Sequence, residues 1–223
     1  MWLEHPPKIQ SVPPKPKPSR HSLNTPESPR LLVATFNRGK LEEMKLSLAT
    51  APVELVSLEA VPGVTAAPEE GTTFEANARQ KAVHYSRFTE FPTIADDSGL
   101  VVDALGGRPG VYSARYLSEQ ASDEERCRKI LEELGPAEDA RRTARFECWI
   151  ALAERGVVLE VFRGTLRGVI GRDLRGDNGF GYDPIFQLPE RGCSLAELSP
   201  GEKLRISHRG RALRKLQRAL FGS

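Results

Sequence analysis

Phe91-Pro92-Thr93-Ile94-Ala95-Asp96-Asp97-Ser98-Gly99 sets two adjacent carboxylates directly after a short apolar run. The run has the composition of a buried strand, and we expect this strand, at residues 93–95, to end in the aspartates. Two ionised groups at such a place cost free energy unless a cation or a proton-transfer task accompanies them. The stretch therefore predicts both the central strand of the fold and a functional site at its end.

Strands and helices alternate on both sides of this stretch. Residues 31–34 and 53–58 are apolar runs of strand length, with a helical pattern between them. Residues 146–152 and 157–162 flank a glycine turn and predict a hairpin, which is antiparallel. Because strand–helix–strand units are parallel, the combination predicts an α/β fold with a mixed sheet.

Three helix starts are marked by capping residues. Thr72-Thr73-Phe74-Glu75 predicts a capping box before the aspartates, and Ser122-Asp123-Glu124-Glu125 predicts a second one. Ser207 is expected to cap the final helix. That helix is expected to pack its leucines inward and to keep four arginines largely outside, namely Arg209, Arg211, Arg214 and Arg218.

The first 29 residues differ in composition from the rest of the chain. They hold eight of the 17 prolines, a pattern typical of a disordered, extended segment. Residues 1–30 contain five Lys or Arg and two Glu, so they account for +3 of the total charge of +2 and leave the remainder at −1. We therefore expect a basic tail at 1–29, one domain at 30–223, and no nucleic-acid partner for the domain.

Cysteine usage and hydropathy suggest the compartment. Cys127, Cys148 and Cys193 are odd in number and widely spaced, which argues against a disulfide framework and a zinc site. No apolar stretch approaches the roughly 18 residues that a membrane span needs. We expect a cytoplasmic protein without membrane association.

Two segments have the residue types that bind phosphate and metal. Thr35-Phe36-Asn37-Arg38-Gly39-Lys40 lies between the first strand and the first helix, where backbone N–H groups favour an anion, although a polar turn is equally consistent. The oxygens of Asp96 and Asp97 suit Mg²⁺, and Glu69 or Glu70 could add a carboxylate. A plain Asp-Ser-Gly turn is the alternative.

Two further segments could recognise a base. Residues 176–184 form a glycine loop in which Phe180 could offer an aromatic face, unless the loop is a hairpin with core aromatics. Lys203 and Ser207-His208-Arg209 place cations near a helix start, where a bound anionic or carbonyl-rich ligand would offset their unfavourable position.

Taken in this order, the four segments resemble the inosine/xanthosine triphosphate pyrophosphatase family over residues 31–221. The resemblance implies an elongated α/β fold with a central mixed β-sheet flanked by helices, and a nucleotide cleft between two lobes. It also implies a homodimer and Mg²⁺-dependent hydrolysis of non-canonical purine nucleoside triphosphates (ITP, dITP, XTP). The products would be the monophosphate and pyrophosphate.

The resemblance also implies roles for single residues. Asp97 would be the general base and a metal ligand, and Glu69 would be the second metal ligand. His208 and Arg209 would read the purine edge. The full set implied to bind substrate is Thr35, Phe36, Asn37, Arg38, Gly39, Lys40, Lys81, Ser98, Phe180, Gly181, Tyr182, Asp183, Lys203, His208 and Arg209.

The chain departs from the family pattern at two positions. Ala76 stands where relatives usually have an acid before Asn77, and Pro68 replaces an acid beside Glu69. The second metal ligand therefore stays open between Glu69 and Glu70. A non-catalytic nucleotide sensor is the alternative function, and nucleic-acid binding through the tail is a third hypothesis.

Overall fold

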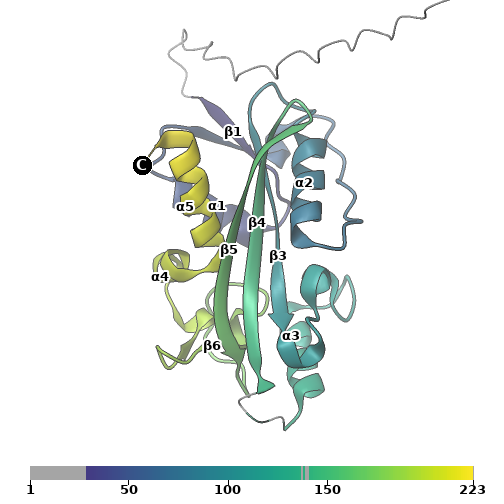
Figure 1. Ribbon diagram of the computed structural model, residues 1–223, viewed down its shortest axis with the longest axis vertical. Coiled ribbons are helices and arrows are strands. Elements are labelled where there is room, and N and C mark those ends of the chain that lie inside the picture. Colours follow the sequence, from purple (N-terminus) through teal and green to yellow (C-terminus); the bar gives the residue numbers. More distant parts are fainter. Residues whose placement is uncertain (1–28, 137, 139–140, 223) are drawn as a thin grey trace, which may run out of the picture.

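A seven-stranded sheet runs the length of the molecule, with strand order β2-β1-β3-β4-β5-β6-β7 (Figure 1). The computed structural model describes residues 29–136, 138 and 141–222, so all of the predicted tail except Pro29 lies outside the described residues. The strands are β1 (Arg30–Val33), β2 (Glu54–Ser57), β3 (Thr93–Val102), β4 (Thr143–Glu154), β5 (Val157–Ile170), β6 (Phe186–Leu188) and β7 (Cys193–Ser194). β1 is parallel to β2 and β3, whereas the other pairs are antiparallel. The predicted mixed sheet is confirmed.

Helices lie on both faces of this sheet. The α-helices are α1 (Arg38–Leu48), α2 (Phe74–Tyr85), α3 (Asp123–Leu134), α4 (Pro200–Ile206) and α5 (His208–Phe221). Short 3₁₀ turns join them, namely η1 (Leu58–Ala60), η2 (Asp103–Leu105), η3 (Gly110–Arg115), η5 (Asp183–Ile185) and η6 (Leu195–Glu197). None of the helices in the described part of the chain is long and apolar enough to cross a bilayer.

The strand that carries the aspartates is longer than the sequence predicts. We expected it to end at residue 95, but the ladder between β3 and β4 continues without interruption from Thr93 to Val102. Asp96 and Asp97 therefore lie in mid-strand, and because successive side chains of a strand point to opposite faces, they do not form a pair. The expectation of two carboxylates side by side at a strand end is wrong.

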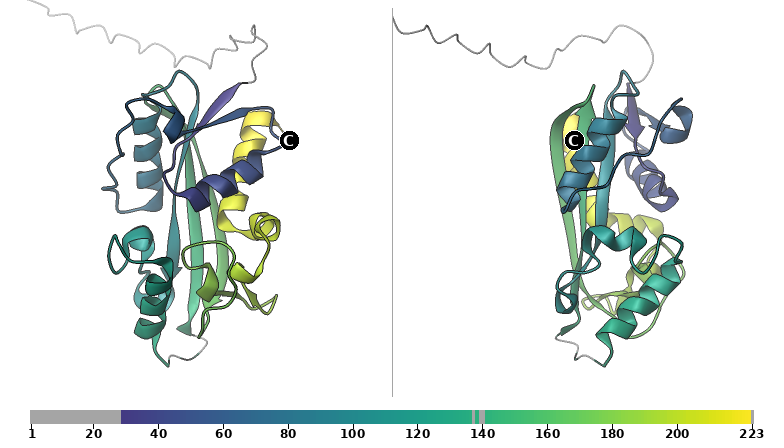
Figure 2. Two further views of the ribbon diagram at one scale, coloured as in Figure 1. Left: turned by 180° about the vertical axis from the view of Figure 1, so that it is seen from behind. Right: turned by 90° about the vertical axis from the view of Figure 1, so that its right-hand side faces the viewer.

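Two hydrophobic clusters cover the two faces of the upper half of the sheet. On one face, Met44 of α1 and Leu213 of α5 pack with Ile94 and Ile150. On the other face, α2 packs alanines and Tyr85 against Ala95 and the adjoining strands. The view from behind in Figure 2 shows α1 and α5 on one side of the strands and α2 on the other. Ile94 and Ala95 thus fix which face each aspartate occupies.

A third cluster fills the opposite end of the molecule. Cys127 and Ile130 of α3 pack against Phe146 and Phe186 there. In Figure 1, α3 and β6 lie at the lower end of the long hairpin of β4 and β5, whereas α1 and α2 lie at the upper end. The long strands therefore join two separate packing centres, which agrees with the predicted elongated, two-lobed fold.

Local capping signals were mostly correct. Ser122 forms the predicted capping box with Glu125, and the Ser207 hydroxyl accepts from the Gly210 N–H at the start of α5. The box at Thr72 is wrong, because Thr73 is the cap of α2 and accepts from the backbone of Ala76.

The expected position of Arg209 is also wrong. The residue is 1% exposed rather than outside, whereas Arg211 and Arg218 are exposed as predicted. Its partners, described next, explain the burial.

Candidate active site

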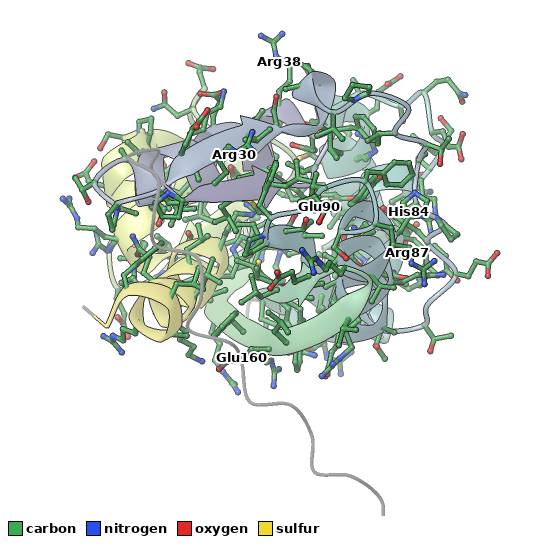
Figure 3. All side chains as sticks on the ribbon, turned by 90° about the horizontal axis from the view of Figure 1, so that it is seen from above. Arg30, Arg38, His84, Arg87, Glu90 and Glu160 are labelled. Atoms are coloured by element: carbon green, nitrogen blue, oxygen red, sulfur yellow. The ribbon has the colours of Figure 1, made fainter. Side chains whose placement is uncertain are left out.

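The loop between β1 and α1 is ordered by its own polar side chains. Asn37 Oδ1 accepts from the Lys40 N–H at 3.0 Å, and Thr35 Oγ1 accepts from the Asn37 N–H at 3.2 Å. Phe36 is 60% exposed, and Arg38 points away from the molecule in the end-on view of Figure 3. Lys40 turns inward instead, with Nζ 3.2 Å from Asp96 Oδ1.

The same loop touches the glycine loop that follows β5. A Cβ added to Gly39 would lie 2.5 Å from the Phe180 ring, so only glycine allows the two loops to approach so closely. This contact joins the first and third of the four sequence motifs, which are far apart in the chain.

Asp96 is the centre of a buried group of charges. We call this group the Asp96 cluster; it consists of Lys40, Glu43, Asp96, Ser98, Asp183, Lys203 and Arg209. Arg209 pairs with Asp96 and with Glu43, and Lys203 pairs with Glu43 and with Asp183. Three cations therefore balance three acids, which is the condition under which buried charges are tolerated.

Both oxygens of Asp96 lie beside cations within this cluster, although Oδ1 accepts no hydrogen bond from the described residues. Oδ1 contacts Lys40, and Oδ2 accepts from Ser98 and from Arg209. Burial raises the pKa of Asp96, but the charges of Lys40 and Arg209 outweigh it and hold the pKa well below its usual range. Asp96 is thus an ionised anchor for cations, and its lowered pKa makes it a weak base.

A second group of charges lies on the opposite face of β3. We call it the Asp97 cluster; it consists of Glu69, Asn77, Lys81, Asp97 and Arg115. Lys81 Nζ lies 2.9 Å from Asp97 Oδ1 and 3.1 Å from Glu69 Oε1, so both acids contact one ammonium group. Arg115 holds the other oxygen of Glu69 at 3.3 Å. Glu70 is exposed, and its backbone N–H donates to Gln80 Oε1 of α2 at 3.4 Å.

Electrostatics within the Asp97 cluster favour the charged forms. Burial lowers the pKa of Lys81, but the charges of Asp97, Asp96 and Glu69 raise it overall. Burial raises the pKa of Glu69, but the charges of Lys81 and Lys40 lower it overall. Lys40 therefore acts on both clusters: it pairs with Asp96 on one side and stabilises the Glu69 carboxylate on the other.

A pocket of about 80 Å³ opens beside the Asp96 cluster. The Phe180 ring lies 4.5 Å from Lys203 Nζ and 5.6 Å from the Arg209 guanidinium carbon. The His208 ring stacks on Phe146 with centroids 4.7 Å apart and planes 11° apart. Aromatic rings and cationic side chains thus line the pocket.

His208 is the one member of this pocket with an unused buried nitrogen among the described residues, since its Nδ1 has no hydrogen-bond partner. Burial, together with the charges of Arg209 and Lys203, lowers the pKa of His208 well below its usual value. A neutral imidazole with a free polar atom is suited to a hydrogen bond with an uncharged ligand group.

Ten of the predicted residues line this pocket, and they come from all four motifs. They are Asn37, Lys40, Ser98, Phe180, Gly181, Tyr182, Asp183, Lys203, His208 and Arg209. Thr35, Phe36, Arg38, Gly39, Glu69, Lys81 and Asp97 lie outside its lining. Of these, Glu69, Lys81 and Asp97 form the second cluster, and Lys40 connects the two groups.

Comparison with known proteins identifies the family. The profile of the Ham1 family matches residues 31–219. The chain belongs to the Ham1 family. A Geobacter sulfurreducens protein named dITP/XTP pyrophosphatase is 50% identical over 188 residues, which cover 84% of this chain and 94% of that protein. A Shigella flexneri protein of the same name is 46% identical over 194 residues, which cover 86% of this chain and 98% of that protein.

Solved structures agree with this assignment. A HAM1 protein from Coxiella burnetii has a TM-score of 0.77 at 42% identity, covering 87% of this chain and 100% of its own. A Mycobacterium abscessus structure described as a nucleoside-triphosphatase and dITP/XTP pyrophosphatase has a TM-score of 0.67 at 43% identity, covering 84% and 97%. The family and the fold that the four motifs predicted are confirmed.

Sequence reasoning missed two polar residues of this Ham1-family site, the half-buried Glu43 and the buried Asn77. Glu43 is the acid that both Lys203 and Arg209 contact, and Asn77 donates to Asp97. A signal existed for each. Glu43 is next to the predicted core residue Met44, and Asn77 is four residues before Lys81 on the inner face of α2, so both interrupt an apolar stripe.

Proposed function

We propose that this protein hydrolyses non-canonical purine nucleoside triphosphates, namely ITP, dITP and XTP, to the monophosphate and pyrophosphate, and so removes them from the nucleotide pool. Relatives named dITP/XTP pyrophosphatase at up to 50% identity support this reaction. The observation that carries it is that Lys40 lines the aromatic pocket and its charge also lowers the pKa of Glu69 in the Asp97 cluster. A base and its phosphates need these two environments side by side.

The pocket is suited to a purine with an oxygen at position 6. Arg209 has five N–H donors, and its bonds to Asp96, Glu43 and Ser98 use four of them, which leaves one Nη1 hydrogen. We assign that hydrogen and the free nitrogen of His208 to the base edge, with Phe180 stacking on the ring. ATP would set an amino group against these donors, and such a mismatch lowers the rate by several powers of ten.

The phosphates are assigned to the loop between β1 and α1 and to the lysines near it. Thr35, Asn37, Lys40 and Ser98 would hold the triphosphate, with the backbone N–H groups of Arg38 and Gly39 at the start of α1. Lys81 would add positive charge from the other face of β3. Charge neutralisation and positioning are the main requirements of phosphoryl chemistry.

Mg²⁺ fits the Asp97 cluster. The described residues contain no group of three or more His, Cys, Asp or Glu that could hold a metal without other ligands. Mg²⁺ in nucleotide enzymes commonly uses one or two carboxylates and takes further ligands from phosphates and water. Glu69 and Asp97 meet this requirement, since both already face one positive charge, that of Lys81. When bound, Mg²⁺ would supply positive charge at the phosphates.

Asp97 is our candidate for the general base that orients and deprotonates the attacking water. We propose direct attack by water without a covalent enzyme intermediate, and the thiols of Cys127 and Cys148 are unsuited to nucleophilic attack. Burial raises the pKa of Cys148, and it raises the pKa of Cys127 to about 12. Asp183 would fix the base loop, because it accepts from the Phe180 N–H at 2.9 Å.

A nucleotide panel tests the function. Pyrophosphate release is measured with ITP, dITP, XTP, ATP and GTP in the presence of Mg²⁺. We expect kcat/KM for the first three to exceed that for ATP and GTP by at least about 100-fold. Comparable turnover of all five would contradict the proposed selectivity. Tight ITP binding without hydrolysis over hours would support a nucleotide sensor instead.

Three further expectations belong to this proposal. We propose that the protein is a homodimer, that it works in the cytoplasm, and that nucleic acid is not its partner. Light scattering at micromolar concentration tests the first and cell fractionation the second. A steeply salt-dependent affinity for DNA or RNA, lost on deletion of residues 1–29, would contradict the third.

A further inference from the structure

The buried side-chain amide of Asn77 forms hydrogen bonds through both its oxygen and its nitrogen. The residue is 0% exposed and lies near the N-terminal end of α2, facing β3. Its Oδ1 accepts from the Gly71 N–H at 2.8 Å, and its Nδ2 donates to Asp97 Oδ2 at 3.1 Å. One side chain thus connects the loop before α2 with the candidate general base.

The direction of this amide is dictated by its partners. A backbone N–H can only donate, so the oxygen of Asn77 must face Gly71 and the NH₂ group must face Asp97. The reversed orientation would set donor against donor and oxygen against carboxylate. The contact with Asp97 is therefore specific for an amide at position 77.

Gly71 allows the loop to come close enough for this bond. A Cβ at position 71 would lie 2.5 Å from Asn77 Oδ1 and 2.9 Å from the Ala76 Cβ. The loop is thus attached to α2 two residues after Glu69. Lys81, four residues further along the same helix face, contacts Glu69 and Asp97 directly. Two adjacent side chains of α2 therefore hold both acids in one arrangement.

We propose that Asn77 is a positioning residue that fixes the orientation of Asp97 relative to the segment carrying Glu69. Lys81 contacts Oδ1 of Asp97 and supplies a positive charge. Asn77 donates to Oδ2 of the same carboxylate and so fixes its orientation. The proposal rests on the proposed function for its kinetic consequence, but its structural consequence can be measured without turnover.

Two variants of Asn77 separate its two bonds. Asn77→Ala removes both, whereas Asn77→Asp keeps an acceptor for Gly71 and sets a like charge against Asp97. We expect both variants to lower kcat for ITP by about 10- to 100-fold, the usual effect of losing a residue that orients a metal ligand. The KM for ITP, and the Kd for ITP measured by calorimetry in EDTA, should stay within about threefold of wild type, since the base pocket is untouched.

Gln80→Ala is the matched control. Gln80 Oε1 accepts from the Glu70 N–H at 3.4 Å, so it attaches the same loop to the same helix without contacting Asp97. Its kcat should stay within about twofold of wild type. An equal loss of kcat in Gln80→Ala, or wild-type kcat in Asn77→Asp, would show that anchoring of the loop alone matters and would overturn the proposal.

A measurement without substrate keeps the two proposals distinguishable. Amide hydrogen exchange should be fast at Gly71 in Asn77→Ala and protected in wild type and in Asn77→Asp. Unchanged protection in Asn77→Ala would overturn the positioning role whatever the activity. If wild type fails to hydrolyse ITP while Gly71 behaves as expected, the proposed function fails and the structural link between Asn77 and the loop stands.

Discussion

Asp96 and Asp97 are neighbours in the chain but belong to environments that differ in almost every respect. The Asp96 side chain is 0% exposed and faces α1 and α5, where cations and a hydroxyl occupy both oxygens. The Asp97 side chain is 8% exposed and faces α2, where it shares Lys81 with Glu69. The Glu69 side chain is 37% exposed, so this second cluster reaches solvent.

The difference indicates two uses of buried charge. A closed cluster with balanced charges fixes the side chains around it, in this case Arg209 and Lys203 beside the pocket. A cluster that reaches solvent can exchange partners, so it can admit water, phosphate or a metal ion. Adjacent carboxylates in a strand thus belong to two separate clusters, and Glu69 is the acid that shares Lys81 with Asp97.

The largest expected effect is a loss of activity on substitution in the Asp97 cluster. Asp97→Asn should lower kcat for ITP by about 10³-fold, because the amide cannot accept a proton from water. Its free energy of unfolding should fall less than that of Asp96→Asn, since Lys81 keeps Glu69 as a partner. Steady-state kinetics and denaturant unfolding of the same preparation measure both quantities. Full activity in Asp97→Asn would exclude Asp97 as the base.

A substitution in the Asp96 cluster should lower the free energy of unfolding. Asp96→Asn leaves the Arg209 guanidinium with less negative charge in a fully buried place, and breaking such a pair costs about 3 to 5 kcal/mol. Denaturant unfolding measures this loss. A stability equal to wild type, combined with lost turnover, would reverse the roles that we give to the two aspartates.

Local signals in the sequence predicted much of this fold. The strand-length runs, the hairpin turn and the Ser122 cap depend on near neighbours, and each is present, although β4 (Thr143–Glu154) and β5 (Val157–Ile170) extend beyond the predicted 146–152 and 157–162. The length of β3 was underestimated because a polar segment was interpreted as a strand end. It continues because partners from α1, α2 and α5 satisfy the aspartates, and those partners are distant in sequence.

The site was less predictable for the same reason. Arg209 is four residues before Leu213 and so lies on the buried stripe of α5, but an arginine is normally assigned to the surface. It is inside because Glu43 and Asp96 compensate its charge. Helical periodicity predicts the face of α5 on which Arg209 lies, whereas the acids that compensate its charge are known only from the tertiary structure.

The smallest expected effect is on the pH dependence of the free energy of unfolding, and it comes from His208 beside the Asp96 cluster. Burial lowers the pKa of His208 well below its ordinary value, so the folded protein keeps this imidazole neutral while the unfolded chain takes up a proton below about pH 6.5. The unfolded state then binds more protons, and stability falls as pH falls, by at most about 1.4 kcal/mol per pH unit. His208→Gln should lack this part of the slope between about pH 6.5 and pH 5. Denaturant unfolding of both proteins at several pH values measures the difference, and the contribution of the other three histidines cancels because both proteins contain them. Parallel curves would mean that His208 binds its proton equally in the folded and unfolded states.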